Sequence, residues 1–173
     1  MVEEDGTAYR YPAMFSRYLR EHYSVPAVYR WRVLQVQPGE RETVYIGEAE
    51  DLIRRIQRVR TPARGSKGGE TNRRLKQIFD EKISSGRTVV LDVADFEPFE
   101  INGVSFSSNE LEDRFKRRAL ENLVLCFAQA EKQEILNKVV DPVRKAVKAL
   151  QRLPRSQLRE VVAALQQKVG KAG

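Results

Sequence analysis

The spacing of hydrophobic residues in the first sixty positions predicts a helix, a two-stranded hairpin and a second helix. Apolar residues recur at helical spacing over residues 11–23, and a break is expected at Pro26, because the residue before a proline avoids helical backbone angles. Residues 27–36 and 43–46 are rich in Val, Ile, Tyr and Trp, and the short turn at residues 37–40 predicts antiparallel pairing. Gly47 is expected to end the second strand, and residues 48–60 return to helical spacing.

The remaining pattern predicts a helix at 70–84, a strand at 88–93, an irregular or hairpin segment at 97–104 and a long helix at 107–131. The second half of that long helix is apolar nearly all round, which indicates a central buried position. Two amphipathic helices are expected at 133–150 and 156–169. The fold class is therefore α/β of the α+β kind: a small three-stranded antiparallel sheet flanked by helices. A soft boundary near residue 132 separates residues 1–132 from a helical tail, 133–173, for packing or dimerisation.

Length and composition limit the class of protein. The chain has 173 residues, of which 41% are hydrophobic, which is enough for a packed core. The longest apolar run is far shorter than the roughly 20 residues of a membrane-spanning helix. The first residues are acidic and lack an apolar segment, so no signal peptide is expected. The single cysteine, Cys126, is expected to be a small core residue, and a cytoplasmic location follows as the expectation.

The charge balance favours a polyanionic partner. Lys and Arg number 31 against 24 acidic residues, giving a net charge of +7 and an isoelectric point near 9.7. An excess of this size on a small domain favours nucleic acid. One Cys and one His exclude zinc sites built from several such ligands, so any metal is held mainly by oxygen, as magnesium or manganese prefer. The one histidine, His22, is expected at the surface or in packing.

Glu121 is the first candidate for chemistry. It lies in a helical stretch so apolar that burying its carboxylate needs a partner. That partner is an arginine or lysine, a hydrogen-bond network or a metal ion. The alternatives are a purely structural ion pair or a helix face that meets solvent.

Two tyrosines of the hairpin and one arginine of the next helix form a second set of candidates. Tyr29 and Tyr45 can lie side by side across the strand pair, and Gly47 permits a close approach of backbone or ligand. Arg55 flanks the buried stripe of its helix, so it either extends into solvent or points towards the hairpin. The alternative is that the tyrosines only fill the core and the arginine is only solvated.

In this order, Ala27-Val28-Tyr29, Tyr45-Ile46-Gly47, Arg55 and Glu121 resemble the GIY-YIG nuclease domain over about residues 25–125. The resemblance implies a nuclease domain within residues 1–132 and a metal-dependent endonuclease that hydrolyses phosphodiester bonds of DNA, of restriction, defence or repair type. It implies that Tyr29 or Tyr45 positions or deprotonates the attacking water. Arg55 would stabilise the charge that develops on the phosphate, and Glu121 would hold Mg²⁺ or Mn²⁺.

The sequence departs from the family pattern at several positions. Ala27 replaces a usual glycine, Glu48 a frequent lysine, and Val59 a frequent histidine or tyrosine. Either one tyrosine acts as the base, or a residue such as Lys67 substitutes, or activity is low or absent. The late asparagine of the family corresponds to Asn137 or Asn122. The second hypothesis is therefore a nuclease-like module that binds DNA without cutting it, and a third is a partner-interaction domain.

Basic residues cluster in sequence around these candidates. If they share a face, they would bind DNA phosphates without sequence preference. The expected DNA-binding residues are Arg30, Arg32, Arg58, Arg64, Lys67, Arg73 and Arg74. The C-terminal helices are expected to pack on the core or to form a homodimer, which would present two active sites to the two strands of a duplex.

Overall fold

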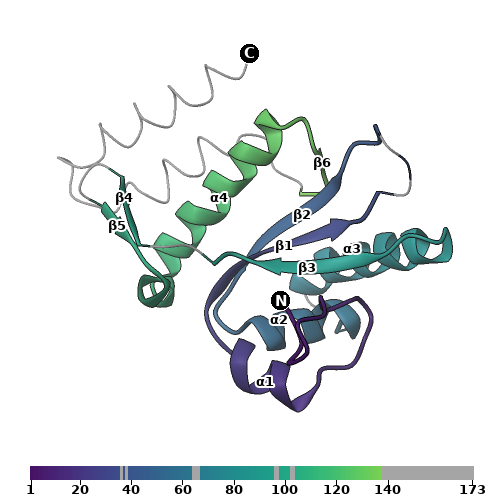
Figure 1. Ribbon diagram of the computed structural model, residues 1–173, viewed down its shortest axis with the longest axis horizontal. Helices are drawn as coiled ribbons and strands as arrows, with labels where there is room; N and C mark the ends of the chain where they lie inside the picture. Colours follow the sequence, from purple (N-terminus) through teal and green to yellow (C-terminus); the bar gives the residue numbers. More distant parts are fainter. Residues whose placement is uncertain (36, 38, 64–66, 96–97, 102–103, 138–173) are drawn as a thin grey trace.

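The computed structural model describes residues 1–137 except 36, 38, 64–66, 96–97 and 102–103. Its centre is a four-stranded sheet with the strand order β3-β1-β2-β6. The strands are β1 (Ala27–Val33), β2 (Thr43–Ala49), β3 (Val89–Val93) and β6 (Glu134–Ile135). Figure 1 shows helices on both sides of this sheet. The mixed α/β class expected from the sequence is confirmed.

Strands β3, β1 and β2 are antiparallel, as expected, but the sheet has a fourth strand. β1 pairs with both β2 and β3 in antiparallel register, whereas β6 runs parallel to β2 at its outer edge. The helix expected from residue 133 onward is therefore wrong over residues 133–137. Two residues of strand are too short to leave a hydrophobic period in the sequence. The remainder of the expected helical tail, residues 138–173, lies outside the described residues.

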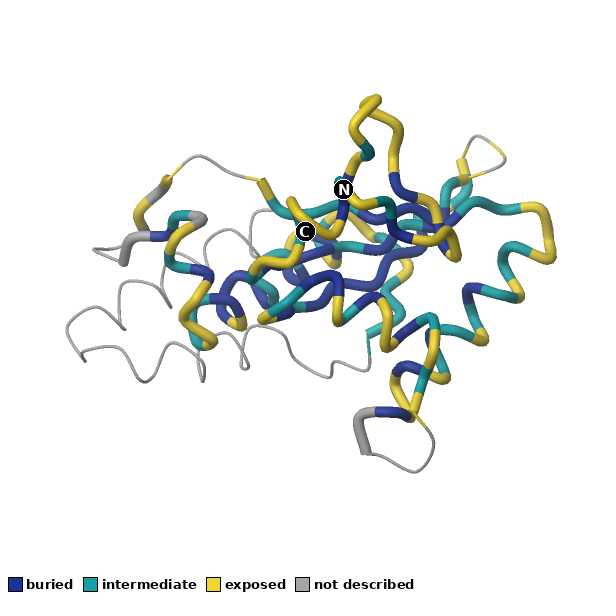
Figure 2. Tube along the Cα trace, turned by 90° about the horizontal axis from the view of Figure 1, so that it is seen from below, coloured by how far each residue is buried: buried dark blue, intermediate teal, exposed yellow. Residues whose placement is uncertain are grey.

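The two faces of the sheet are covered by different helices. α1 (Arg17–Tyr23), α2 (Leu52–Arg60) and α3 (Lys67–Ser84) lie on one face, and α4 (Arg114–Ala130) lies on the other (Figure 1). Alternation along β1 explains this division, because successive strand residues point to opposite faces. Tyr29 and Trp31 join the core beneath α2 and α3, while Val28 packs with Leu120 of α4. Strands β1 and β2 are buried along most of their length (Figure 2).

Several element ends differ from the sequence-based expectation. Residues 11–16 are not helical, because Tyr11 N–H donates to Val89 O beside β3 and the helix begins only after its cap, Ser16. Met14, within this non-helical stretch, is 70% exposed. Gly47 does not end β2, which continues to Ala49. Hydrogen bonding and capping decided these ends, which the hydrophobic period does not register.

The segment before α4 is built from two short pieces. β4 (Phe99–Ile101) and β5 (Val104–Phe106) pair as a hairpin, in the region where an irregular or hairpin segment was expected. A 3₁₀ turn, η1 (Ser108–Glu112), follows. Asp113 then caps α4, since its carboxylate accepts from the N–H groups of Phe115 and Lys116. The single long helix expected over 107–131 is thus a 3₁₀ turn and a separate α-helix. Within the described ranges, no helix is both long and apolar enough to cross a membrane.

Candidate active site

Arg55 is the centre of a polar cluster at the side of the sheet that carries α2 and α3. Its Nε donates to the Tyr29 hydroxyl at 2.9 Å, and its Nη2 lies 3.5 Å from the Tyr45 hydroxyl. Its Nη1 donates to the side-chain oxygen of Asn72 on α3. Arg55 itself comes from the first half of α2, one residue before the fully buried Ile56. Three partners from three elements therefore fix the plane of one guanidinium group.

The register of the hairpin brings the two tyrosines together. Tyr29 is paired with Gly47 and Trp31 with Tyr45, so the tyrosines are diagonal neighbours on one face. Their ring centroids are 6.5 Å apart. A Cβ atom on Gly47 would lie 2.5 Å from the Tyr29 hydroxyl oxygen, closer than any packed contact allows. The missing side chain of Gly47 is therefore what lets Tyr29 lie across β2 and reach Arg55.

Burial keeps both tyrosines protonated at neutral pH. Burial raises the pKa of Tyr29, and the neighbouring Tyr45 raises it further, against an opposing effect of the Arg55 charge. Burial also raises the pKa of Tyr45, with Arg55 again opposing. Since an ordinary tyrosine already titrates near pH 10, neither hydroxyl is a base in this state. Each can accept from Arg55 and still donate its own proton to a ligand oxygen.

Glu121 lies on α4 within electrostatic range of both hydroxyls. Its negative charge contributes to the raised pKa of Tyr29 and of Tyr45. The side chain is half-buried. In the described part of the chain, no three His, Cys, Asp or Glu side chains gather as a metal site. A magnesium ion needs only one or two protein carboxylates when substrate phosphate and water complete its coordination shell. Glu121, together with oxygen ligands from phosphate and water, therefore fits Mg²⁺ or Mn²⁺.

Asn137 joins the cluster through the backbone of β2. Its Oδ1 accepts from Ile46 N–H at 2.9 Å, and its Nδ2 donates to Ile46 O at 2.6 Å. These bonds extend the β6 pairing along the edge of β2, directly beside Tyr45. Arg74 of α3 donates to Leu136 O at 2.8 Å, and its charge lowers the pKa of Tyr45. The other candidate asparagine, Asn122, donates instead to Arg118 O one turn back in α4.

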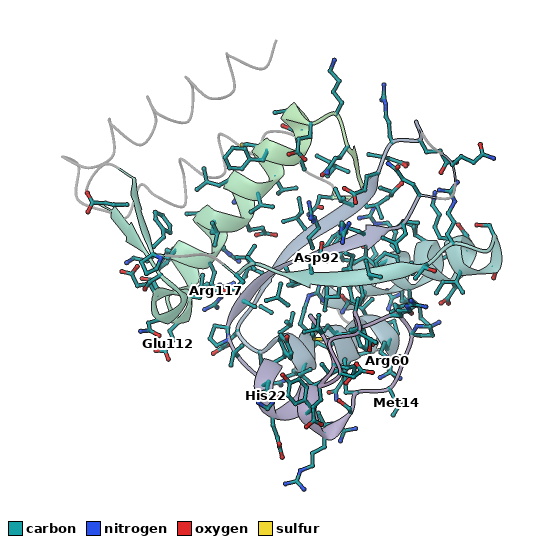
Figure 3. The ribbon with its side chains drawn as sticks, in the orientation of Figure 1. Met14, His22, Arg60, Asp92, Glu112 and Arg117 are labelled. Atoms are coloured by element: carbon teal, nitrogen blue, oxygen red, sulfur yellow. The ribbon has the colours of Figure 1, made fainter. Side chains whose placement is uncertain are left out.

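The structure does not bring all of the expected DNA-binding residues to this cluster. Arg30 and Arg32 lie on the opposite face of the sheet, where both donate to Asp92 on β3. Figure 3 labels Asp92. Arg32 also pairs with Glu42 at 3.2 Å. Strand alternation is the reason, because these arginines alternate with Tyr29 and Trp31. Their charges are already matched by carboxylates, so they do not form one basic face with Arg55.

The remaining basic candidates divide into three groups. Arg58 is exposed on α2, and the exposed Arg73 donates to Ala63 O at 3.0 Å. Lys67 begins α3, but its side chain lies outside what the structure describes. Arg64 is outside the described residues altogether.

The positions that depart from the family pattern have structural roles. Glu48 pairs with Arg117 at 3.0 Å and lies 3.7 Å from Arg118, both on α4. Val59 lies on the buried side of α2 and is completely buried. His22 is exposed and stacks on Tyr18. Val59 therefore supplies no proton-transfer group, and the Glu48 carboxylate is held by its ion pairs with Arg117 and Arg118.

Asn72 is the site residue that sequence reasoning missed. It is only 5% exposed and lies on the same stripe of α3 as Leu75 and Phe79. The signal was available: positions 72, 75 and 79 follow helical spacing, so an asparagine interrupts an apolar stripe. A buried amide in such a stripe needs hydrogen-bond partners, and here one of them is Arg55.

Comparison with protein-family models, curated proteins and solved structures gives no match for this chain. The resemblance to GIY-YIG domains therefore remains a prediction from the quoted residues.

Proposed function

We propose that this protein is a metal-dependent DNA endonuclease of the GIY-YIG type, with its active site around Arg55. The observation that carries the proposal is the environment of the Arg55 guanidinium. All of its hydrogen bonds to described residues go to neutral oxygens, those of Tyr29, Tyr45 and Asn72. A fixed arginine with neutral partners keeps its full charge for an incoming anion. The net charge of +7 supports a polyanionic substrate.

Phosphodiester hydrolysis needs an in-line nucleophile and neutralisation of the charge that builds on the phosphate oxygens. Arg55 supplies the second, because a guanidinium binds phosphate with parallel donors and stays ionised. Tyr45 and Tyr29 orient the attacking water and the phosphate. Their hydroxyls accept hydrogen bonds from Arg55 and donate to water or to a phosphate oxygen. A tyrosine becomes a base only if cations lower its pKa, and Arg55 and Arg74 act on Tyr45 in that direction. Tyr45 is therefore the better candidate for activating water.

Glu121 would hold the divalent ion, with Asn137 and β6 fixing the adjacent edge of β2. When bound, such an ion supplies Lewis-acid stabilisation of phosphate oxygens. The carboxylate would also orient water near the two hydroxyls, since a carboxylate accepts hydrogen bonds from water or from a protonated phenol.

The test is cleavage of supercoiled plasmid DNA with Mg²⁺ or Mn²⁺. We expect the parent protein to nick or linearise the plasmid, and Glu121→Gln and Arg55→Ala to lose about a hundredfold or more of the rate. Glu131→Gln is the matched control, because Glu131 is an exposed glutamate just after α4. Equal rates for Glu121→Gln and the control would refute the proposed role of Glu121.

A second candidate function is a DNA-binding module that does not cut. The buried Val59 and the raised pKa of both tyrosines favour it, because no evident base adjoins Arg55. Salt-sensitive DNA binding by the parent without cleavage on any metal would select this function. In that case Arg55→Ala would weaken binding, and Glu121→Gln would leave it unchanged or strengthen it.

A further inference from the structure

A groove opens beside Arg55 between α2 and the first turns of α4. Its volume is about 570 Å³, and five arginines and three acids line it. Arg55 lines the groove and also contacts the tyrosines, so the groove is continuous with the candidate active site. Figure 3 labels Arg117 on the α4 side of this region.

Two of the acids in the groove are already engaged. Glu48 forms its ion pair with Arg117, which is 3% exposed and also donates to Leu111 O and Glu112 O. The carboxylate of Asp51 accepts from Arg54 N–H as the cap of α2. The third acid, Glu50, is exposed and can turn into solvent. Glu48 and Asp51 therefore stabilise the structure around the groove more than they neutralise the positive charge of its arginines.

Three arginines of the groove have no such engagement. Arg54, Arg58 and Arg114 are exposed, and none makes an ion pair or side-chain hydrogen bond to a described residue. Arg54 and Arg58 are one helical turn apart on α2, where like charges repel and destabilise a helix. An anion between them and Arg114 would relieve that repulsion. Because guanidinium groups from two helices face one groove, the arrangement suits a row of phosphates better than one point charge.

We propose that this arginine groove binds the backbone phosphates that adjoin the phosphate held at Arg55. The proposal rests on the proposed function, since it takes a nucleic-acid strand as the ligand. The strand would run from Arg55 along α2 and past the start of α4, with contacts to phosphates and none to bases. Binding in the groove is therefore indifferent to sequence and dependent on salt.

The first test measures binding of a short labelled DNA duplex by fluorescence anisotropy, without divalent metal, from about 50 to 200 mM salt. One triple variant carries Arg54→Ser, Arg58→Ser and Arg114→Ser. The control triple carries Arg10→Ser, Arg20→Ser and Arg41→Ser, with the same loss of charge at exposed positions outside the groove. We expect the slope of log K against log salt to become shallower by about 2 to 3 in the groove variant, at about 0.9 per phosphate contact. Equal slopes for the two triples would overturn the proposal.

A second test locates the contacts. Single phosphates of the duplex are replaced by neutral methylphosphonates, one at a time, on both sides of the bond that the protein cuts. A neutral linkage one or two steps away on one side should weaken binding by the parent and the control triple, but not by the groove triple. An equal penalty in all three proteins would overturn the assignment of those phosphates to the groove. A triple change of the same arginines to lysine should keep most of the salt slope.

The two proposals fail in different ways. A parent that binds with the expected slopes but never cuts keeps the groove and rejects the nuclease. A parent that cuts, with slopes that the groove triple leaves unchanged, keeps the nuclease and rejects the groove. A parent that does not bind DNA at all overturns the groove outright.

Discussion

Two arginine clusters lie on opposite faces of the same sheet, and they differ in their partners. On the face beneath α4, Arg30 and Arg32 meet the carboxylate of Asp92, and Arg32 also meets Glu42. On the face beneath α2, Arg55 meets only hydroxyl and amide oxygens among the described residues.

The difference separates an arginine that holds the fold from one that is ready to bind. A carboxylate partner neutralises a guanidinium, whereas a neutral oxygen orients it and leaves its charge available. The number of arginines near a site is therefore a poor guide to binding, and the chemistry of their partners is a better one.

The largest expected effect separates the two clusters by activity. Arg55→Lys should lower the DNA cleavage rate by about 10² to 10³. A lysine ammonium lacks the planar set of donors with which the guanidinium contacts its three protein partners and a phosphate at the same time. Arg32→Lys should leave the rate within about twofold and lower only the free energy of unfolding. Plasmid cleavage and urea unfolding of both variants measure the contrast. A similar loss of rate in both would mean that the sheet face beneath α4 also binds substrate.

The next effect concerns the packing that lets Tyr29 reach Arg55. Gly47→Ala should lower the free energy of unfolding by about 2 kcal/mol, the usual cost of forcing atoms into a packed core. The added Cβ meets the end of a ring that is 1% exposed and cannot easily move aside. The control is a double-mutant cycle, in which urea unfolding is measured for Gly47→Ala, Tyr29→Ala and the double variant. The cost of Gly47→Ala should largely vanish in that background, and a persistent cost would place the clash elsewhere.

A smaller effect would convert one cluster into the other. Asn72→Asp gives Arg55 a carboxylate partner, as Arg32 already has. The protein should stay folded, while the new carboxylate neutralises the Arg55 charge that would otherwise bind phosphate. We expect a loss of about tenfold in cleavage rate, or about 1.4 kcal/mol in the barrier. Thr71→Asp adds the same charge at an exposed position on α3 and serves as the control. An unchanged rate in Asn72→Asp would show that Asn72 does not position Arg55 for reaction.

The smallest effect distinguishes the clusters by pH. Tyr29 and Tyr45 have raised pKa values, mainly through burial, so the stability that they contribute is complete below pH 10 and is lost as pH rises beyond it. Burial opposes ionisation of Asp92, but the hydrogen bonds of Arg32 and Arg30 outweigh it and hold the pKa of Asp92 below 3.8. That contribution is therefore lost as pH falls below about 4.

Urea unfolding across pH checks both signs. Tyr29→Phe should flatten part of the alkaline decline. The rest should remain, because burial also raises the pKa values of Tyr9, Tyr11 and Tyr45. Asp92→Asn should flatten the acid decline and leave the alkaline one unchanged. An alkaline change in Asp92→Asn would contradict the separation of the two clusters.

Much of the local structure follows from the sequence alone. Hydrophobic periods located β1, β2, β3, α2 and α3 to within a few residues, because a packed face repeats every 2 or 3.6 positions. The same periods made Glu121 conspicuous, since a carboxylate in an apolar stretch of helix needs a reason to be there. The resemblance to GIY-YIG domains, and not periodicity, joined Glu121 with Tyr29, Tyr45 and Arg55 into one expected site.

Only the tertiary structure decided which residues contact one another across the fold. Register made Tyr29 the partner of Gly47, and alternation sent Arg30 and Arg32 to the far face although they are neighbours of Tyr29 in sequence. β6 and its bonds from Asn137 to Ile46 join segments 91 residues apart, and no local pattern records such a pairing. Periodicity reports how each segment divides between core and solvent, whereas hydrogen bonds and ion pairs across the fold depend on the complete packing. The charge of Arg55 that is available to a ligand also depends on the complete packing. The guanidinium keeps this charge because Asn72 and two tyrosines surround it, and not a carboxylate such as that of Asp92.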